Sequence, residues 1–590
     1  MAHKKVNSHT KSVQEKLDIL KQNLMDGFAA EKGKKIKCFI SVGYKNMRAV
    51  VFHGVGNTAN TAFKSAQSRA LKFIKSQNAE PPWLKADVVT MEKTLELDEF
   101  LILASRIKKY YFKYGISFDE MYNNAFLQQE VNAGALIKYH TSQSINPKPP
   151  KEIQDLIGLS FDADSRHVQA EINYNNINVY NRTVRGQHVV LSADIINEVT
   201  IFETKGWFFD EEQLFEMDDN ELCTSRRKID ALSPDMTKDL LVKMSGYLAG
   251  TVEESGRFVY GYYSCYNKVI STYNCIRHAL AVYSLCETYL VTKDEALLKP
   301  IKKSFAYLLD KFIYEVDEYA FVVESESTSE IKLGALGVTI LSITKYLEIF
   351  DEKEQYLPLL RKIGNAIRYM QNPVTGQFSH VFSYPNLELV EKFRIVYYSG
   401  EAAFALMRIY ALDQDELWLK TVRKAFDYFI KHNYWNNYDH WLAYCINELT
   451  AVSPDDKYFE FGLKNAFSNI DFIEKRITTW ATLLEMMTAS YKMIKNIQKN
   501  DKGYLLNDYD LNRISNVMKV RAERLLNGIF FPEHAMYFKS PETILYGSFI
   551  RHNTFRVRND DVAVHLLGYC RYLNDVMGVE EWVLGSQSLM

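Results

Sequence analysis

The chain has 590 residues, of which 47% are hydrophobic and 24% are charged, and its formal net charge is −2. This near-neutral balance excludes a basic protein that binds nucleic acid or acidic membranes. No apolar run is long enough to span a bilayer, and the N-terminal segment lacks the apolar core of a secretory signal. Seven scattered cysteines, an odd number, are typical of a reducing compartment rather than of a disulfide framework. We therefore expect a cytoplasmic protein without nucleic-acid partners or a membrane span.

The N-terminal part divides into four predicted segments. Residues 1–35 predict a lysine-rich amphipathic helical arm. Residues 36–91 predict a small α/β module, because KCFISVGY and RAVVFHG alternate as strands while TANTAFKSAQSRALKFIKS has helical periodicity. Residues 92–145 are predicted as a helical connector, with helices in LDEFLILASRIKKYYFKYG and FDEMYNNAFLQQEVNAGALIKY. Residues 146–235 are predicted as a mixed α/β middle region that opens with the linker-like SINPKPPKEIQ.

The α/β module also contains GVGNTANTAF directly before its helix. Backbone N–H groups at a helix N-terminus can bind an anion. The stretch nevertheless matches neither the dinucleotide-binding nor the P-loop pattern. We interpret it as a turn followed by a helix N-cap.

Residues 236–590 repeat a unit of one apolar helix, a short acidic turn and one charged amphipathic helix. Six such pairs predict an (α/α)6 toroid, in which buried inner helices lie inside an outer ring with one wet face. The predicted fold class is therefore α+β, multidomain and mainly α. Apolar helices are predicted to begin near Thr272, Ile331, Ser399, Asp439, Arg476 and Asp560. Charged helices are predicted near 237–251, 295–314, 355–371, 416–432, 456–473 and 510–527.

The segment EIKLGALGVTILSITKYLEIF (Glu330–Phe350) shows why an inner ring is expected. It is apolar on nearly every side, whereas a surface helix of this length has a polar face. Glycine inside a helix costs about 1 kcal/mol relative to alanine, so Gly334 and Gly337 indicate close approach of a neighbouring backbone. An open superhelical solenoid would use the same helix pairs, but six units and several long loops favour a closed ring.

Long aromatic and polar loops lead into the inner helices, while the return connections are short. Long loops in a compact domain usually carry function. All of them are expected at the end of the toroid where the inner helices have their N-termini. The predicted site is therefore a cup, with the positive ends of helix dipoles at its floor.

The C-terminal part consists of helix pairs, with outer helices of the type WLKTVRKAFDYFI and inner helices such as YDHWLAYCINEL. In this arrangement it resembles the six-hairpin toroid superfamily. That superfamily includes N-acylglucosamine 2-epimerase-like isomerases, many glycoside hydrolases, and some uronic-acid epimerases and lyases. The resemblance covers somewhat over half of the chain and concerns architecture, since no complete catalytic signature of one family is present. It implies carbohydrate processing in the cup.

Glycoside hydrolysis needs two carboxyl groups, one of them with a raised pKa, and epimerisation needs two proton-transfer groups on opposite faces of the sugar. Arginines can receive a carboxylate or phosphate of an anionic sugar. The candidate catalytic residues are Arg277, His278, Glu324, Glu326, Glu401, Asp439, His440 and Asp560. The candidate substrate-binding residues are Tyr263, Tyr273, Lys332, His380, Arg394, Tyr398, Arg551, Arg556 and Arg558.

Structural interpretations of these residues stay open beside the catalytic ones. Glu401 and Asp439 are also suited to capping helix N-termini. RVRNDD, which begins at Arg556, also fits an ion-pair cluster that closes the sixth hairpin on the first. Arg277–His278 is the preferred pair for the site because charge inside a buried helix must be used or paired, yet His278 also fits a hydrogen-bonded core histidine.

We expect a sugar isomerase, epimerase or glycoside hydrolase that uses acid/base residues and requires no cofactor or metal. Its expected ligand is a small-molecule or oligosaccharide substrate, and the N-terminal module could bind a protein partner. The alternative is a non-catalytic glycan-binding or complex-assembly protein. A third hypothesis is a zinc-dependent cyclase using Cys265, Cys275 and His278, but the chain lacks the Cys-Gly and Cys-His-Gly motifs of those enzymes.

Overall fold

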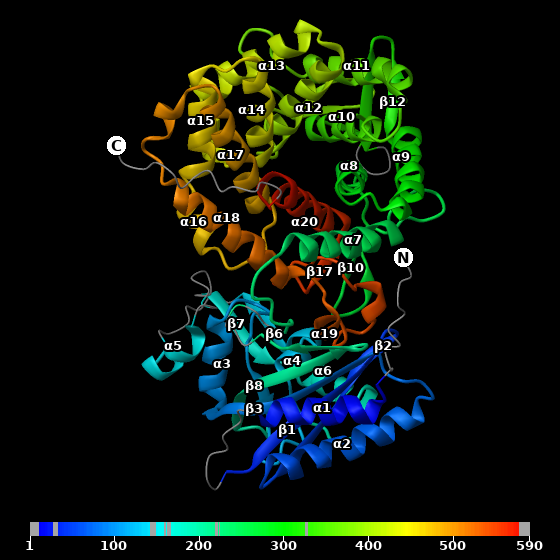
Figure 1. Cartoon of the computed structure of the whole chain (residues 1–590), viewed down its shortest axis with the longest axis vertical. Coiled ribbons are helices and arrows are strands. Elements are labelled where there is room, and N and C mark those ends of the chain that lie inside the picture. Colours follow the sequence, from blue (N-terminus) through cyan, green and yellow to red (C-terminus); the bar gives the residue numbers. More distant parts are fainter. Residues whose placement is uncertain are drawn as a thin grey trace, which may run out of the picture. The chain divides into compact units, whose positions relative to one another are not determined.

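The computed structural model describes residues 11–26, 34–141, 149–158, 161, 167–218, 222, 225–324 and 329–577. The chain forms two compact units (Figure 1). We call Met1–Asp230, Tyr262–Lys268 and Asn527–Val557 the sheet unit. We call Ala231–Gly261, Val269–Leu526 and Arg558–Met590 the helical unit. Across the described residues, no helix combines the length and apolar character needed to cross a membrane.

The sheet unit is built on a seven-stranded antiparallel sheet with the strand order β2-β1-β3-β8-β4-β5, and β9 pairs with β8. Alternating β-branched and aromatic residues form the long strands, as period-2 patterns predict. The strands are β1 (Ile36–Tyr44), β2 (Met47–Gly56), β3 (Trp83–Glu96), β4 (Gly115–Ser117), β5 (Ala125–Phe126), β8 (Glu198–Asp210) and β9 (Gln213–Glu216).

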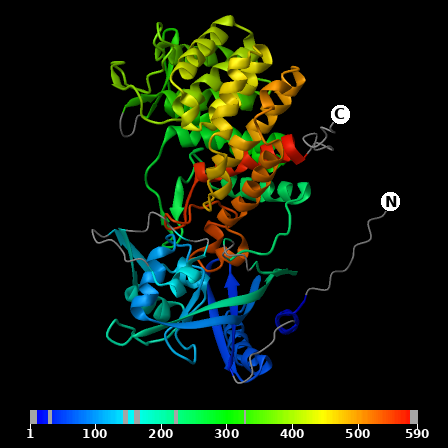
Figure 2. The same cartoon turned by 90° about the vertical axis from the view of Figure 1, so that its left-hand side faces the viewer.

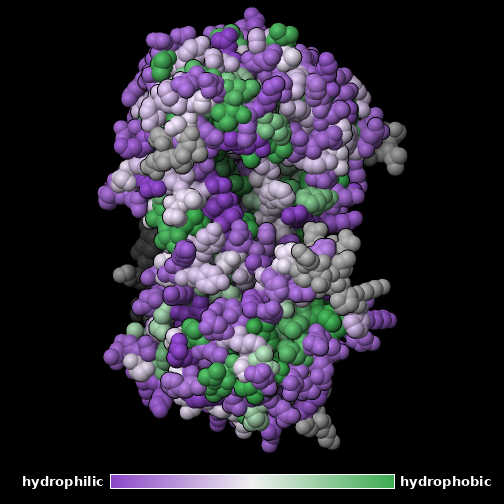
Figure 3. Space-filling model, turned by 180° about the vertical axis from the view of Figure 1, so that it is seen from behind, coloured by the Kyte–Doolittle hydropathy of each residue, from purple (hydrophilic) through white to green (hydrophobic). Residues whose placement is uncertain are grey.

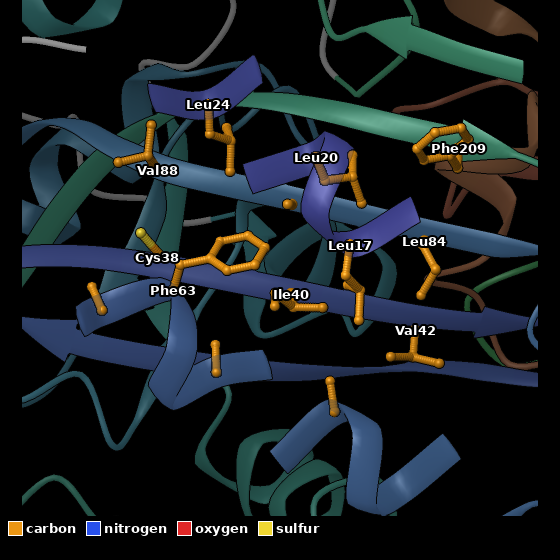
Figure 4. Packing of buried hydrophobic residues seen from close by; sticks show 14 of the residues in the cluster. Leu17, Leu20, Leu24, Cys38, Ile40, Val42, Phe63, Leu84, Val88 and Phe209 are labelled. Atoms are coloured by element: carbon orange, nitrogen blue, oxygen red, sulfur yellow. The ribbon is translucent and has the colours of Figure 1, made fainter. Parts of the chain in front are cut away.

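Two helices, α1 (Val13–Met25) and α2 (Ala59–Ser76), pack on one face of this sheet. Both begin with capping boxes: the Ser12 hydroxyl accepts from the Glu15 N–H, and the Thr58 hydroxyl accepts from the Thr61 N–H. Figure 4 shows one hydrophobic cluster in which apolar side chains of both helices meet those of β1 and β3. Its labelled residues are Leu17, Leu20, Leu24, Cys38, Ile40, Val42, Phe63, Leu84, Val88 and Phe209.

The structure differs from the predicted segments in the position of α1 and in the length of β3. The helix predicted within residues 1–35 is present, but it packs on the sheet instead of extending from it as an arm, since Leu17 and Leu20 are fully buried. β3 continues from Trp83 to Glu96 through the expected end of the α/β module. One sheet thus contains strands from three of the predicted segments.

The predicted long helix in FDEMYNNAFLQQEVNAGALIKY is wrong. The segment contains β5, the short helix α4 (Gln128–Ala133) and β6 (Ile137–Thr141). Left-handed backbone at Tyr122 (φ 60°) and Ala135 (φ 50°) interrupts the helical path on both sides of α4. The unit also contains α3 (Leu97–Arg106), α5 (Lys151–Ile157), β7 (Val168–Ile172), α6 (Tyr174–Thr183) and α19 (Pro532–Ala535).

Two segments that the sequence places within the C-terminal toroid belong to the sheet unit instead. Tyr537, in Asn527–Val557, shares a 2.8 Å hydrogen bond with the Ser41 hydroxyl of β1. Glu533 accepts hydrogen bonds from the Arg227 guanidinium at 3.0 and 2.7 Å. These buried polar contacts bind the inserted segment to the sheet unit, and only the tertiary structure reveals them.

The described residues of the helical unit form six inner helices, each of which packs against the next, while α20 packs back against α8. They are α8 (Cys275–Thr292), α10 (Leu333–Leu347), α12 (Tyr398–Asp413), α14 (His440–Val452), α17 (Thr482–Lys499) and α20 (Asn559–Arg571). The α20–α8 contact closes the ring and excludes the open solenoid. The chain is therefore mainly α and multidomain, as predicted.

Six amphipathic helices surround these inner helices and pack against them. They are α7 (Pro234–Gly250), α9 (Leu298–Phe312), α11 (Lys353–Tyr369), α13 (Glu416–Lys431), α15 (Asp456–Phe467) and α18 (Leu511–Leu525). The short α16 (Ile470–Lys475) follows α15. We call the twelve paired helices the helical ring.

Three inner helices begin two or more residues later than predicted: α8, α10 and α17. Glu330–Lys332 forms strand β14 of a five-stranded sheet, so α10 begins only at Leu333. The other strands of this sheet are β12 (Ile313–Val316), β13 (Tyr319–Glu324), β15 (Val381–Ser383) and β16 (Leu389–Glu391). The fifth inner helix begins at Thr482 because the preceding loop is held open by Arg521, which donates to the carbonyl oxygens of Arg476 (2.7 Å) and Thr478 (3.0 Å).

Candidate active site in the helical ring

The loop-bearing end of the helical ring is hollowed. Figure 2 shows the yellow-green loops between α11 and α12 on the left side of the ring, while α20 ends on the right. Figure 3 views the left-hand side of Figure 2 and shows a recess among the side chains of the ring. This is the end at which the inner helices have their N-termini, as the loop lengths predict.

Four titratable side chains gather at three consecutive inner helices, and we call them the acid cluster: Glu401, Asp439, His440 and Glu485. Glu401 lies in the first turn of α12, Asp439 and His440 begin α14, and Glu485 lies in the first turn of α17. Asp439 is the N-cap of α14, because its Oδ1 accepts from the Trp441 N–H at 2.9 Å. His440 Nε2 lies 3.8 Å from Glu485 Oε2.

Two glycines, Gly400 on α12 and Gly334 on α10, leave space for the carboxyl groups of the cluster. A Cβ atom on Gly400 would lie 2.1 Å from Asp439 Oδ2, and one on Gly334 would lie 2.2 Å from Glu401 Oε2. No side chain fits at either position without displacing a carboxyl group. The small residues of the inner helices therefore make room for the acid cluster.

Every member of the acid cluster has a buried polar atom without a hydrogen-bond partner: Glu401 Oε2, Asp439 Oδ2, His440 Nδ1 and Glu485 Oε2. Such atoms are uncommon in folded proteins, because an unsatisfied buried polar group costs about 1–3 kcal/mol. Asp439 and Glu485 are fully buried, whereas Glu401 and His440 remain 6% and 4% exposed. The two partly exposed groups could therefore contact a ligand directly.

Burial controls the protonation of the acid cluster. It raises the pKa of Glu401 to about 8, and it raises that of Glu485 to about 8 even though the Tyr444 hydroxyl donates to Glu485 at 3.0 Å. The pKa of Asp439 also lies well above its ordinary value, through burial and then the Glu401 charge. Burial lowers the pKa of His440 to about 3. At neutral pH the site therefore holds protonated carboxyl groups beside a neutral imidazole.

One aromatic side chain, Tyr397, borders the acid cluster, and two others are exposed in the loops that lead into α12 and α17. The Tyr397 ring centroid lies 5.2 Å from that of His440, and the pKa of Tyr397 is raised by burial and then by Asp439, Glu401 and Glu485. Trp480 is 40% exposed just before α17, and Phe393 is 48% exposed in the loop before α12. Exposed aromatic side chains in the loops that lead into polar helix starts are typical of small-ligand sites.

Three predicted catalytic residues, Glu401, Asp439 and His440, thus lie together. The predicted binding residue Tyr398 lies beside Glu401, since its ring lies 2.5 Å from the Cβ position of Gly334 that also faces Glu401. Its pKa is raised by burial and then by Glu401 and Glu324. Tyr398 therefore lies next to the acid cluster, beside Glu401.

A second group of predicted residues is paired within itself. Lys332 bonds to Glu324, and Arg394 holds Glu330 through two hydrogen bonds of 2.8 and 3.0 Å. The Arg394 backbone N–H also donates to His380 Nδ1 at 3.0 Å. These contacts stabilise the loops around the five-stranded sheet. Lys332 and Arg394, which the sequence suggests as substrate-binding residues, are therefore paired with carboxylates of the protein itself.

Arg277, Asp560 and Arg558 form an ion cluster between α8 and α20. Arg277 Nε lies 2.8 Å from Asp560 Oδ2, and Arg558 lies 3.0 Å from Asp560 and 3.2 Å from Asp561. This joins the sixth hairpin to the first, which is the structural interpretation of RVRNDD.

His278 is a hydrogen-bonded core histidine. Its Nδ1 shares a 2.7 Å hydrogen bond with the Tyr273 hydroxyl, and its Nε2 lies 2.8 Å from the Ser304 carbonyl oxygen. Both ring nitrogens are therefore occupied, which leaves neither for a metal ion. The Cys275 thiol contacts Glu324 Oε1 at 3.4 Å.

The remaining candidates lie outside this arrangement. Tyr263, Arg551 and Arg556 belong to the sheet unit. There Arg551 is buried, and its guanidinium lies 5.3 Å from the Tyr111 ring centroid and 5.2 Å from that of Phe555. Glu326 lies outside the described residues. Within the described ranges, no three His, Cys, Asp or Glu side chains are grouped so that they could hold a metal ion.

Glu485 and Tyr444 were missed from the sequence. The sequence points to Glu485 only as a single carboxyl group in the apolar stretch TTWATLLEMMTASY. It points to Tyr444 only as a tyrosine in HWLAYCINEL. The sequence predicts that this helix begins near Arg476, so Glu485 falls outside its predicted first turn, whereas α17 begins at Thr482.

The raised pKa of Glu485 predicts a pH-dependent stability. Its folded pKa is about 8 against an ordinary value of 4.5, so the stabilisation by the protonated form is complete below pH 4.5 and is lost as pH rises through about 8. Glu485→Gln keeps a neutral group at every pH. We expect its free energy of unfolding to rise relative to the parent between pH 5 and pH 9, by about 1 kcal/mol or more.

Urea unfolding at pH 5, 7 and 9 measures this difference. Glu354→Gln, at an exposed position in the first turn of α11, is the matched control and should follow the parent at all three pH values. Parallel stability curves for the parent and Glu485→Gln would contradict the assignment of a buried proton to Glu485.

No family model matches the chain, and no curated protein matches it. Solved structures similar to it include cellobiose 2-epimerase from Bacillus thermoamylovorans B4167, with 11% identity, 58% of this chain and 99% of that chain covered, and a TM-score of 0.46. A sugar epimerase from a ruminal bacterium has 12% identity, 57% and 98% coverage and a TM-score of 0.42. The GH76 α-mannanase BT2949 of Bacteroides thetaiotaomicron has 10% identity, 57% and 95% coverage and a TM-score of 0.41. At these scores the similarities carry no argument about activity.

Proposed function

We propose that the protein is a carbohydrate-processing enzyme, and that the helical ring is an (α/α)6 toroid whose loop-bearing end receives a sugar. The observation that carries this proposal is the acid cluster, with an unpaired buried atom on each of its four members. Exposed aromatic side chains in the loops before α12 and α17 suit the apolar faces of sugar rings, and the partly exposed polar groups of the cluster suit their hydroxyls.

The carboxyl groups favour glycoside hydrolysis as the reaction. A general acid must hold a proton at the working pH, and burial gives Glu401 that property through a pKa of about 8. Asp439 is electrostatically coupled to Glu401, whose charge adds to the raised pKa of Asp439, so the two carboxyl groups do not both ionise near neutral pH. We assign Glu401 as the acid that protonates the leaving oxygen and Asp439 as the second carboxyl group of the pair, which must lose its proton before it can serve as the carboxylate.

Glu485, Tyr444 and His440 are assigned positioning roles. Tyr444 and Glu485 are joined by a 3.0 Å hydrogen bond, and His440 lies between Asp439 (3.9 Å) and Glu485 (3.8 Å). A histidine with a pKa of about 3 is a weak base at neutral pH. Proton abstraction by His440, as sugar epimerisation would need, is therefore less favoured than carboxyl chemistry.

The proposal is tested by incubating the protein with neutral, uronic and phosphorylated sugars and oligosaccharides, with thermal shift and product NMR as readouts. Hydrolysis yields a new reducing end, whereas isomerisation yields a changed sugar without chain cleavage. We expect a stabilising oligosaccharide that is cleaved. Binding without conversion of any sugar would instead support the non-catalytic glycan-binding alternative, and the absence of both binding and conversion would refute the proposal.

A further inference from the structure

A cavity of about 190 Å³ lies in the sheet unit, apart from any residue of the helical unit. It is many times larger than the roughly 10–15 Å³ that one water needs. Apolar side chains of β1 and β2 form part of its wall. Its polar lining comes from His53, Arg69, Arg185 and Gln187.

Arg185 lines the cavity and has one N–H group that donates to no protein atom. Its side chain is only 7% exposed, and its Nη2 donates to the Ala125 carbonyl oxygen at 2.7 Å and to Glu130 Oε1 at 2.8 Å. Its Nε is buried and has no hydrogen-bond partner. A buried guanidinium with an unpaired N–H is costly unless a ligand accepts that proton.

Arg69, on α2, brings a second positive charge to the cavity. Its Nη2 donates to the His53 carbonyl oxygen and its Nε to that of Ser65, which fixes its direction. Among the described residues, no carboxylate is within ion-pairing distance of Arg69. The charge of Asp119 raises the pKa of His53. The Asp119 carboxylate accepts hydrogen bonds from the backbone N–H groups of Asn123 (3.0 Å) and Asn124 (2.7 Å) in a turn.

His53 and Gln187 give the rest of the lining its polarity. Burial, then Arg69 and Arg185, lower the pKa of His53 to about 4, so this imidazole is neutral and adds no charge of its own. Gln187 Oε1 is buried without a hydrogen-bond partner. An amide can offer either its oxygen or its NH₂ group to a ligand, and its oxygen suits a hydroxyl donor.

We propose that this cavity binds a small hydroxylated anion, whose carboxylate or phosphate group pairs with Arg69 and Arg185 and whose hydroxyl group donates to Gln187. Guanidinium groups bind both kinds of anion through paired N–H donors. This site is separate from the acid cluster and would allow an anionic metabolite to bind while the helical ring is free.

Isothermal titration calorimetry on the full chain tests the proposal with glucose 6-phosphate, glucuronate, inorganic phosphate and neutral glucose. We expect at least one hydroxylated anion to bind, and neutral glucose to bind at least tenfold more weakly at this site. Glucose 6-phosphate and glucuronate distinguish a phosphate from a carboxylate ligand, and inorganic phosphate tests whether the charged group suffices.

Variants locate the binding. Arg69→Gln should weaken it at least tenfold, and Arg185→Lys should weaken it while keeping a positive charge beside Glu130. Lys72→Gln removes the same charge from an exposed position of α2 outside the cavity and should bind like the parent. Equal weakening by Arg69→Gln and Lys72→Gln, loss of binding in Glu401→Gln, or no binding of any anion would overturn the proposal. Because Glu401→Gln affects only the helical ring, failure of this proposal is distinguishable from failure of the proposed function.

Discussion

Replacing Glu401 by Gln is expected to lower the turnover of the cleaved oligosaccharide by about 10²–10⁴-fold, the contribution typical of a general acid. Gln has the shape of a protonated Glu but cannot transfer a proton to a leaving oxygen. The protonated state of Glu401 at neutral pH follows from its burial, which raises its pKa to about 8. At pH 7, Glu401→Gln should therefore lose most of its turnover while its melting temperature stays nearly unchanged.

The pH profile provides an independent readout of the same group. Parent activity should fall as pH rises through about 8, where Glu401 loses its proton, and the residual activity of Glu401→Gln should lack that limb. Glu354→Gln, on the outer helix α11, serves as the control with parent-like turnover. If Glu401 only stabilised the start of α12 as a helix-dipole carboxyl, Glu401→Gln would keep full turnover, and the assignment would be wrong.

Replacing Gly337 by Ala is expected to destabilise the protein by about 2 kcal/mol or more. A Cβ atom at Gly337 would lie 2.7 Å from the Glu401 carbonyl carbon and 3.0 Å from the Ala402 nitrogen, both backbone atoms of α12. Backbone cannot rotate away as a flexible side chain can, so α10 and α12 would have to separate. This outweighs the roughly 1 kcal/mol that alanine gains over glycine inside a helix.

Gly246→Ala is the matched control for this prediction. Gly246 lies inside the outer helix α7, and a Cβ atom there would meet nothing within 4 Å. The same substitution should therefore stabilise the protein by about 0.5–1 kcal/mol. Urea unfolding of both variants measures the two signs, and a stable Gly337→Ala variant would show that the inner helices are not in backbone contact.

The helical ring could be predicted from the sequence because its signal is local. Each inner helix is apolar on nearly every side and each outer helix on one side only, so periodicity within about twenty residues is sufficient. The segment Glu330–Lys332 was assigned to a helix because its strand pairing with β13 and β15 involves residues outside that window. The same limit explains why Asn527–Val557 was not recognised as part of the sheet unit.

The candidate site was only partly predictable because charge pairing is not local. Glu401, Asp439 and His440 were found by their position at predicted helix starts. Arg394 and Glu330 have the same signature, yet they hold each other across 64 positions of sequence. Glu485 became visible only when α17 placed it beside Tyr444, which is 41 positions away.

The end of the helical ring opposite the recess is closed by an ion-pair network that includes five of the six inner helices. Glu287 pairs with Lys345 (2.8 Å) and Arg571 (3.2 Å), while Arg408 pairs with Glu348 and with Glu448 (2.7 Å). Under the proposed function, we expect that a polysaccharide does not thread through the ring from one side to the other. A chain end or a short oligomer would then reach the acid cluster, and products would leave by the mouth through which the substrate entered. We therefore expect release after each cut rather than continuous travel along a polymer.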